Sequence, residues 1–147
     1  MLELPGSVLF ACSHNAIRSP MAEALLKYLH GRRIYVQSAG VRAGELDPFA
    51  VEVMDEIGID LSRHRPRDFE QLEDAYFDLV ISLSPEAQHR AVELTRDTAT
   101  TLEFWNMPDP SWTSGSRDQV LEAYRELRDL LLKRIQLRFP VAIPAGM

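Results

Sequence analysis

Short apolar runs that alternate with amphipathic segments are the feature that most limits how this chain can fold. Four runs of five to seven residues are typical of strands, and they cover residues 7–11, 33–37, 77–83 and 101–105. Four segments with apolar residues at three- and four-residue steps are typical of helices, and they cover residues 20–29, 47–57, 85–94 and 118–137. A short helix is also expected at 68–73, and residues 106–116 are expected to form a loop. The alternation predicts an α/β unit with a parallel sheet wrapped on both sides, in which ligands bind at the carboxyl ends of strands.

Capping residues mark where two of these helices begin. Ser19 precedes Pro20 and Asp47 precedes Pro48, so each pair is expected to supply the N-cap and the first helical residue. Gly58 is expected to end the second helix. The apolar faces expected to be buried are Met21, Ala24, Leu25 and Tyr28 in the first helix, and Ala50, Val51, Met54 and Ile57 in the second.

Composition narrows the class of protein. A chain of 147 residues with 46% apolar residues is expected to form one folded domain, residues 1–147. Its formal net charge of −6 argues against nucleic acid or an anionic membrane as the main partner. The start of the chain lacks the basic and apolar regions of a signal peptide, and no apolar run approaches the ~20 residues that span a bilayer. We therefore expect a cytoplasmic protein.

The segment from Cys12 to Ser19 follows the first apolar run and has the form C-x5-R-S. A phosphate group needs several converging N–H donors, and a loop that runs into a helix N-terminus supplies them from its backbone. Arg18 can add a planar contact to two oxygens, and Asn15 tolerates the positive φ that a tight loop needs. The expected phosphate-binding residues are Ser13, His14, Asn15, Ala16, Ile17 and Arg18.

Cys12 is the only cysteine, so an internal disulfide is excluded, and the chain has no Cys/His pattern for zinc. The field that binds an anion also stabilises a thiolate, and Ser19 can donate its hydroxyl to the sulfur. Cys12 is therefore interpreted as a nucleophile. The alternative is a buried cysteine in a strand-to-helix turn with a surface arginine.

These motifs identify a family resemblance. The matching segments are VLFACSHNAIRSPMAEALL (8–26), Ser38-Ala39-Gly40, GIDLSRHRPRDF (58–69), FDLVISLS (77–84) and MPDP (107–110). In this order the chain resembles the low-molecular-weight protein tyrosine phosphatase superfamily, which includes the thioredoxin-coupled arsenate reductases. The resemblance implies a three-layer phosphotyrosine phosphatase I-like fold, with a four-stranded parallel sheet of order 2-1-3-4.

The resemblance also implies roles for residues outside the loop. Asp109 would protonate the leaving oxygen and then activate water, although Pro-Asp-Pro is also a common turn composition. Asn15, Ser19, Ser38 and His64 would support the phosphate loop, although a histidine or serine at such places often has only a packing role. Glu23 either helps to bind a monovalent cation or is a solvated helix residue, and no metal or other cofactor is expected. The three arginines of residues 63–67 are interpreted as a solvated surface.

Several positions depart from the family pattern. His14 replaces a glycine and Ile17 replaces a second loop cysteine. Ser111-Trp112 stands where the eukaryotic enzymes place two tyrosines, and the loop after Gly40 is short, which weakens the case for a phosphotyrosine preference. The two resolving cysteines of the thioredoxin-coupled reductases are also missing, since Ser82 and Ser84 occupy that neighbourhood.

Three functional hypotheses follow. The first is hydrolysis of a phosphorylated protein or a small aryl phosphate through a phosphocysteine on Cys12. The second is reduction of arsenate with an external low-molecular-weight thiol and its redoxin. The third is a non-catalytic module that binds oxyanions and serves regulation.

Overall fold

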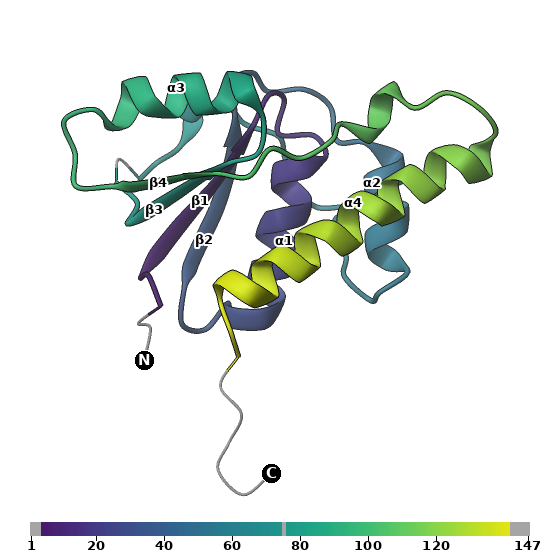
Figure 1. Cartoon of the computed structure of the whole chain (residues 1–147), viewed down its shortest axis with the longest axis horizontal. Helices are drawn as coiled ribbons and strands as arrows, with labels where there is room; N and C mark the ends of the chain where they lie inside the picture. The colour runs from purple at the N-terminus through teal and green to yellow at the C-terminus, as the bar shows by residue number, and fades with distance from the viewer. Residues whose placement is uncertain (1–3, 75, 142–147) are drawn as a thin grey trace, which may run out of the picture.

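A single parallel sheet forms the centre of the protein. The computed structural model describes residues 4–74 and 76–141. The strands are β1 (Ser7–Cys12), β2 (Tyr35–Gly40), β3 (Leu79–Ser82) and β4 (Thr101–Phe104). They lie in the order β2-β1-β3-β4, and every neighbouring pair is parallel (Figure 1). The predicted fold class and strand order are therefore confirmed.

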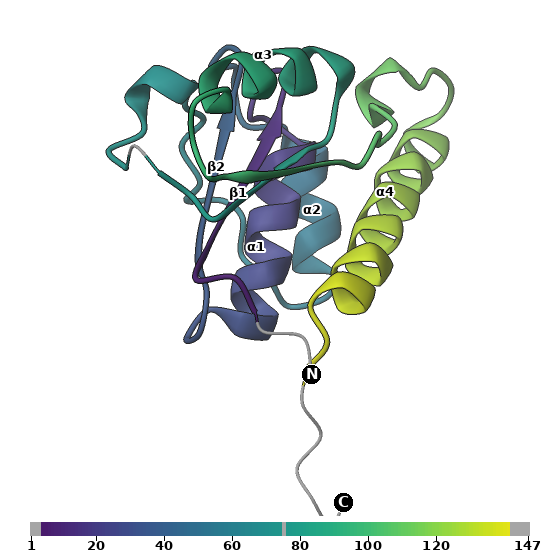
Figure 2. The same cartoon turned by 60° about the vertical axis from the view of Figure 1, so that its left-hand side comes forward.

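Helices cover both faces of the sheet. They are α1 (Arg18–His30), α2 (Pro48–Asp55), α3 (Pro85–Thr95) and α4 (Arg117–Arg138), with short 3-10 helices η1 (Phe69–Gln71) and η2 (Pro110–Trp112). α3 packs on one face, whereas α1 and α4 lie on the other with α2 against α4 (Figures 1 and 2). Within the described residues, no helix combines the length and apolarity that crossing a membrane requires.

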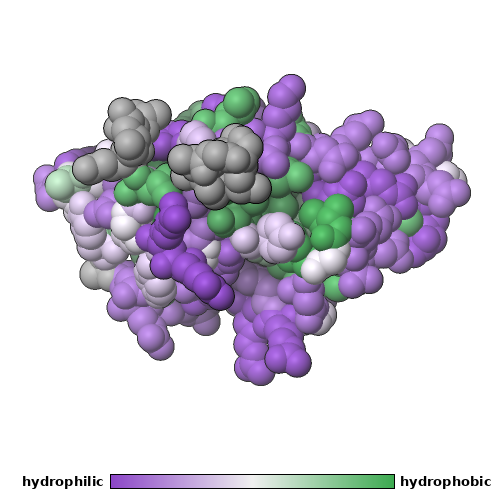
Figure 3. Space-filling view, turned by 90° about the horizontal axis from the view of Figure 1, so that it is seen from below, coloured by the Kyte–Doolittle hydropathy of each residue, from purple (hydrophilic) through white to green (hydrophobic). Residues whose placement is uncertain are grey.

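The burial pattern of β1 explains the layers. Val8, Phe10 and Cys12 belong to the large core under α1, α2 and α4, whereas Leu9 belongs to the smaller core under α3. Both faces of this strand are therefore buried, as expected for a parallel sheet between helices. The outer surfaces carry the polar sides of the amphipathic elements, and the face shown in Figure 3 is hydrophilic over most of its area.

Three sequence-based details are wrong. β2 begins at Tyr35 rather than at residue 33, because the backbone N–H groups of Arg33 and Ile34 both donate to the carbonyl of His30 in a turn. Tyr28 is 72% exposed, so it does not belong to the buried face of α1. Ile57 is also exposed, since α2 ends at Asp55 and the chain turns before it reaches Gly58 at φ +78°.

Candidate active site

Cys12 lies where the strand order reverses. It is the last residue of β1, whose two neighbours are β2 on one side and β3 on the other. Ligands bind at such switch points in open parallel sheets because the loops leave in opposite directions there. Cys12, Arg18 and Asp109 line one cleft of about 270 Å³ at this edge. The structure therefore brings together the three residues that sequence analysis singled out for catalysis.

The carbonyl groups of the loop after Cys12 point away from this cleft. Backbone N–H groups of segment 41–47 donate to carbonyl groups of residues 12–16. The pairs are Val41 to Cys12 (3.0 Å), Arg42 to Ser13 (2.9 Å), Gly44 to His14 (2.8 Å) and Asp47 to Ala16 (3.2 Å). In the described part of the chain, the backbone N–H groups of residues 13–18 donate to no protein acceptor. A loop with tethered carbonyls and unused N–H groups, followed by a helix N-terminus, is suited to hold a tetrahedral anion.

Asn15 fixes the shape of this loop. Its φ of +52° makes it the one described non-glycine residue in the left-handed region, which costs energy that the surroundings must offset. The side-chain amide is buried and makes four hydrogen bonds: to Ser19 Oγ (2.8 Å), to Ser38 Oγ (2.9 Å), from the Arg67 N–H (3.0 Å) and from His64 Nε2 (2.9 Å). Both hydrogens and both lone pairs of the amide are therefore used.

This network orients the hydroxyl group next to the sulfur. The Asn15 amide nitrogen can only donate, so Ser19 Oγ is the acceptor of that bond and its own hydrogen points elsewhere. Cys12 Sγ lies 2.8 Å from Ser19 Oγ and is the group that this hydrogen can reach. A hydroxyl donor stabilises a thiolate more than a thiol.

The predicted capping role of Ser19 is wrong. Helix α1 begins at Arg18, its N-cap is Ile17, and no side chain caps it. Ser19 is the second residue of the helix, and its hydroxyl is committed to Cys12 and Asn15. The uncapped N–H groups at the start of α1 therefore remain directed toward the cleft.

Glu23 and His64 complete the network behind the loop. Ser38 donates to Glu23, and Lys27 forms an ion pair with the same carboxylate. Glu23 is only 6% exposed, so it is not a solvated helix residue, and its charge is matched by an ammonium group. His64 Nε2 must donate, because the Asn15 oxygen can only accept. Burial lowers the pKa of His64 despite the opposing effect of the Glu23 carboxylate, so its imidazole is neutral near neutral pH.

Among the described residues, no group of three or more His, Cys, Asp or Glu side chains could hold a metal ion.

Arg18 and Asp109 face the cleft with unused hydrogen-bonding groups. Arg18 Nη1 donates to the carbonyl of Met107 (3.2 Å), while its Nε and Nη2 donate to no protein acceptor in the described part of the chain. Asp109 Oδ1 accepts from the N–H (3.0 Å) and hydroxyl (2.6 Å) of Ser111, which fixes the carboxyl group and leaves Oδ2. Arg18 Nη2 and Asp109 Oδ2 are 3.7 Å apart, longer than a direct hydrogen bond, so both can engage a ligand.

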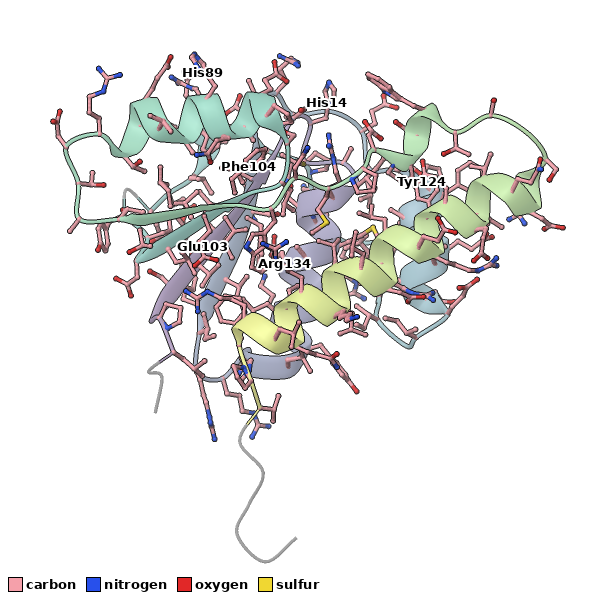
Figure 4. The ribbon with its side chains drawn as sticks, in the orientation of Figure 1. His14, His89, Glu103, Phe104, Tyr124 and Arg134 are labelled. Carbon is pink, nitrogen blue, oxygen red and sulfur yellow. The ribbon has the colours of Figure 1, made fainter. Side chains whose placement is uncertain are left out.

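The structure adds residues that sequence analysis did not assign to this site. Ser84 caps α3 and lies 3.1 Å from the hydroxyl of Ser13, which ties the loop to the third strand. Tyr124 of α4 donates to Asp47 (2.7 Å), which lies in the wall of the cleft. Figure 4 shows His14 exposed at this end of the molecule, next to the start of α3. Only the long-range fold brings Ser84 and Tyr124 here, so no local signal could have identified them.

Comparison with known proteins agrees with this geometry. Residues 7–137 match the family described as low molecular weight phosphotyrosine protein phosphatase. The chain belongs to this family. The chain is also similar to a protein named glutaredoxin arsenate reductase from Synechocystis sp., at 32% identity over 129 residues, which cover 88% of this chain and 92% of that protein.

Two solved structures show how broad the likeness is. The structure of an arsenate reductase in the phosphate binding state is 30% identical, with a TM-score of 0.70 and coverage of 92% of this chain and 98% of that one. A mutant of the YwlE arginine phosphatase with a phosphorylated active-site serine is 26% identical, with a TM-score of 0.72 and coverage of 91% and 97%. The family fold therefore extends over nearly the whole chain.

Gly40 provides a test of how tightly the loop is held. A Cβ atom at this position would lie 2.7 Å from the backbone nitrogen of Asn15 and 2.5 Å from the carbonyl oxygen of Arg42. Because both obstacles are backbone atoms, we expect Gly40→Ala to displace the loop, to lower the free energy of unfolding by about 1–3 kcal/mol and to weaken tungstate binding more than tenfold. Urea unfolding and titration calorimetry measure the two effects.

Gly6→Ala is the matched control, because its Cβ would meet only the end of the flexible Asp78 side chain. Tungstate affinity equal to wild type in Gly40→Ala would contradict the rigid-loop account.

The state of His64 provides a test that depends on pH. Because folding lowers the pKa of His64, the unfolded chain binds more protons, and stability is lost as pH falls below its ordinary value of about 6.5. We expect the free energy of unfolding to fall less between pH 7.5 and 5.5 in His64→Gln than in wild type, since glutamine can still donate to Asn15. His89→Gln is the matched control, because His89 is exposed on α3 and makes no contact with Asn15. Equal slopes for all three proteins in urea titrations would show that His64 does not titrate as described.

Proposed function

We propose that the protein hydrolyses phosphate monoesters through a phosphocysteine intermediate on Cys12. The observation that carries this proposal is that the N–H groups of residues 13–18, which follow the buried Cys12, and two nitrogens of Arg18 donate to no acceptor among the described residues. Such donors stabilise charge that develops on the transferring phosphoryl oxygens, and they need no reorganisation during the reaction.

The first step transfers the phosphoryl group to sulfur. The Cys12 thiolate attacks phosphorus, an S–P bond forms, and the bond between phosphorus and the leaving oxygen breaks. Asp109 in its acid form gives its proton to that oxygen, so that an alcohol or phenol departs. Asp109 Oδ2 is the atom assigned to this transfer, because Oδ1 is occupied by Ser111. The hydroxyl of Ser19 stabilises the thiolate before attack.

The second step restores the enzyme. Asp109, now a carboxylate, takes a proton from water as the water oxygen attacks phosphorus. The S–P bond breaks, orthophosphate leaves and the thiolate returns. One carboxyl group serves both steps, since it is an acid in the first and a base in the second.

The shape of the cleft bears on substrate preference. Its lining residues within the described chain include no phenyl, phenol or indole ring. Ala16 and Gly44 add little or no side-chain surface that could contact a substrate ring. Trp112 is 88% exposed and does not line the cleft, so it does not pack on the domain. We therefore assign substrate selectivity to the phosphate group, so that small aryl phosphates and phosphotyrosine side chains are accepted without a preference for the ring.

Arsenate reduction is the second candidate, favoured by the relatives that are named arsenate reductases and by the single cysteine. Cys12 would attack arsenate and displace water. A first external thiol would then form a mixed disulfide with Cys12 as As(V) is reduced to As(III), and a second thiol would release Cys12 as an external disulfide forms. Ser82 and Ser84 cannot replace the external thiols, because serine forms no disulfide.

Leaving-group dependence tests the phosphatase proposal. We expect Cys12→Ser to abolish hydrolysis, and Asp109→Asn to lower kcat by about 10²–10⁴-fold for phenyl phosphate and by less for p-nitrophenyl phosphate, which needs less proton assistance. Steady-state kinetics with both esters measure this. Tungstate binding by both variants is the control for folding. Slow turnover that is equal in wild type and Cys12→Ser, combined with oxyanion binding, would instead indicate a non-catalytic module.

Thiol consumption tests the second candidate. If arsenate is reduced, wild type with arsenate, glutathione and glutaredoxin should consume two thiols for each arsenite formed, and Cys12→Ser should consume none. A coupled assay that measures NADPH oxidation by glutathione reductase follows the reaction. The candidate is rejected if arsenate causes no consumption above the rate without protein, with glutathione or with other low-molecular-weight thiols.

A further inference from the structure

A second cavity lies behind the network that supports the loop. It has a volume of about 680 Å³ and is bounded by α1 on one side and by residues 60–71 on the other. It shares no lining residue with the cleft over Cys12. Its volume falls within the range of about 300–1,000 Å³ that is typical of small-molecule sites.

The cavity concentrates positive charge in a protein whose formal net charge is −6. Four cations line it, namely Lys27, Arg63, Arg65 and Arg67, against the carboxylates of Glu23 and Asp60. Both carboxylates have their own partners. Glu23 binds Lys27 and Ser38, and Asp60 accepts from the N–H and hydroxyl of Ser62.

The three arginines of the cavity, unlike these carboxylates, have no ion-pair partner among the described residues. Within the described residues, none of Arg63, Arg65 and Arg67 forms an ion pair, although the other lining cation, Lys27, does. Arg67 Nε is shut off from solvent and donates no hydrogen bond. A buried donor without an acceptor is costly, so the protein groups around Arg67 do not satisfy its guanidinium group. Arg63 and Arg65 are exposed, as expected for a solvated surface, whereas Arg67 is half-buried.

We propose that this cavity binds a small polyphosphate, a chain of two or more phosphate groups that is either free or part of a nucleotide. One guanidinium group can hold two oxygens of one phosphate, so three unpaired guanidinium groups around one cavity suit several linked phosphates better than one. Pro20, Ala24, Leu61 and Pro66 add an apolar wall. The proposal does not depend on the reaction at Cys12.

A ligand in this cavity would stabilise the segment that holds the loop around Cys12 in place. The Arg67 N–H and His64 Nε2 both donate to the Asn15 side-chain oxygen, and the Arg67 carbonyl accepts from the Gly40 N–H (2.8 Å). An anion that holds Arg65 and Arg67 would therefore hold the segment that keeps Asn15 at positive φ. Binding at this cavity is expected to stabilise the folded protein as ligand concentration rises.

Titration calorimetry with inorganic tripolyphosphate tests the site. The full chain is used, with tungstate at a concentration that saturates the cleft over Cys12, so that binding reports a second site. We expect one tripolyphosphate per chain, and at least a tenfold loss of affinity in the Arg63→Gln/Arg65→Gln double variant. Both arginines are exposed, so the variant should fold, and an unchanged thermal midpoint without ligand checks this.

Arg96→Gln is the matched control, because Arg96 is exposed at the end of α3, does not line the cavity and forms no ion pair in the described chain. It should bind tripolyphosphate within about twofold of wild type. Arg67→Gln alone should weaken binding as well, and the same concentration of tripolyphosphate should raise the thermal midpoint of wild type more than that of the double variant. The proposal is overturned if tungstate abolishes tripolyphosphate binding, or if the double variant binds as tightly as wild type or no more weakly than Arg96→Gln.

Discussion

Four backbone hydrogen bonds from segment 41–47 hold the carbonyl groups at the end of β1 and in the loop after it, and the proposed function depends on their orientation. With the carbonyls tethered, the N–H groups of residues 13–18 are left for an anion. These hydrogen bonds form because β2 is paired in register with β1 as far as Cys12 and Gly40. The two segments that follow these strands therefore leave the sheet side by side. A strand pairing therefore leaves backbone donors suited to an anion, and Arg18 adds a positive charge beside them.

The polar network behind the loop is the second condition. Asn15 joins α1, β2 and segment 64–67 through hydrogen bonds that use its whole amide group. In a buried environment such bonds are strong, and a missing partner is costly, so the network tolerates few alternatives. The Asn15 side chain therefore offsets the cost of its own left-handed backbone and sets the direction of the Ser19 hydroxyl, whereas the neutral state of His64 follows from burial.

Much of this arrangement is predictable from the sequence, and the exceptions have a common physical origin. The strand and helix order follows from periodicity, and the nucleophile loop follows from residue spacing after an apolar run. Periodicity does not reveal which neighbour covers a helix face, so Tyr28 is predicted to be buried although it is exposed. Nor does it show that the Ser19 hydroxyl contacts Cys12 rather than capping the helix, or that Lys27 lies against Glu23.

The most direct test of the central claim is a crystal structure of the wild-type protein with vanadate. Vanadate adopts the five-coordinate geometry of a phosphoryl group in transfer. The account predicts vanadium bonded to Cys12 Sγ, its equatorial oxygens within hydrogen-bond distance of the N–H groups of residues 13–18 and of Arg18, and an apical oxygen facing Asp109 Oδ2. A well-ordered loop whose carbonyls face the cleft, or vanadate bound elsewhere while the cleft contains only water, would contradict it.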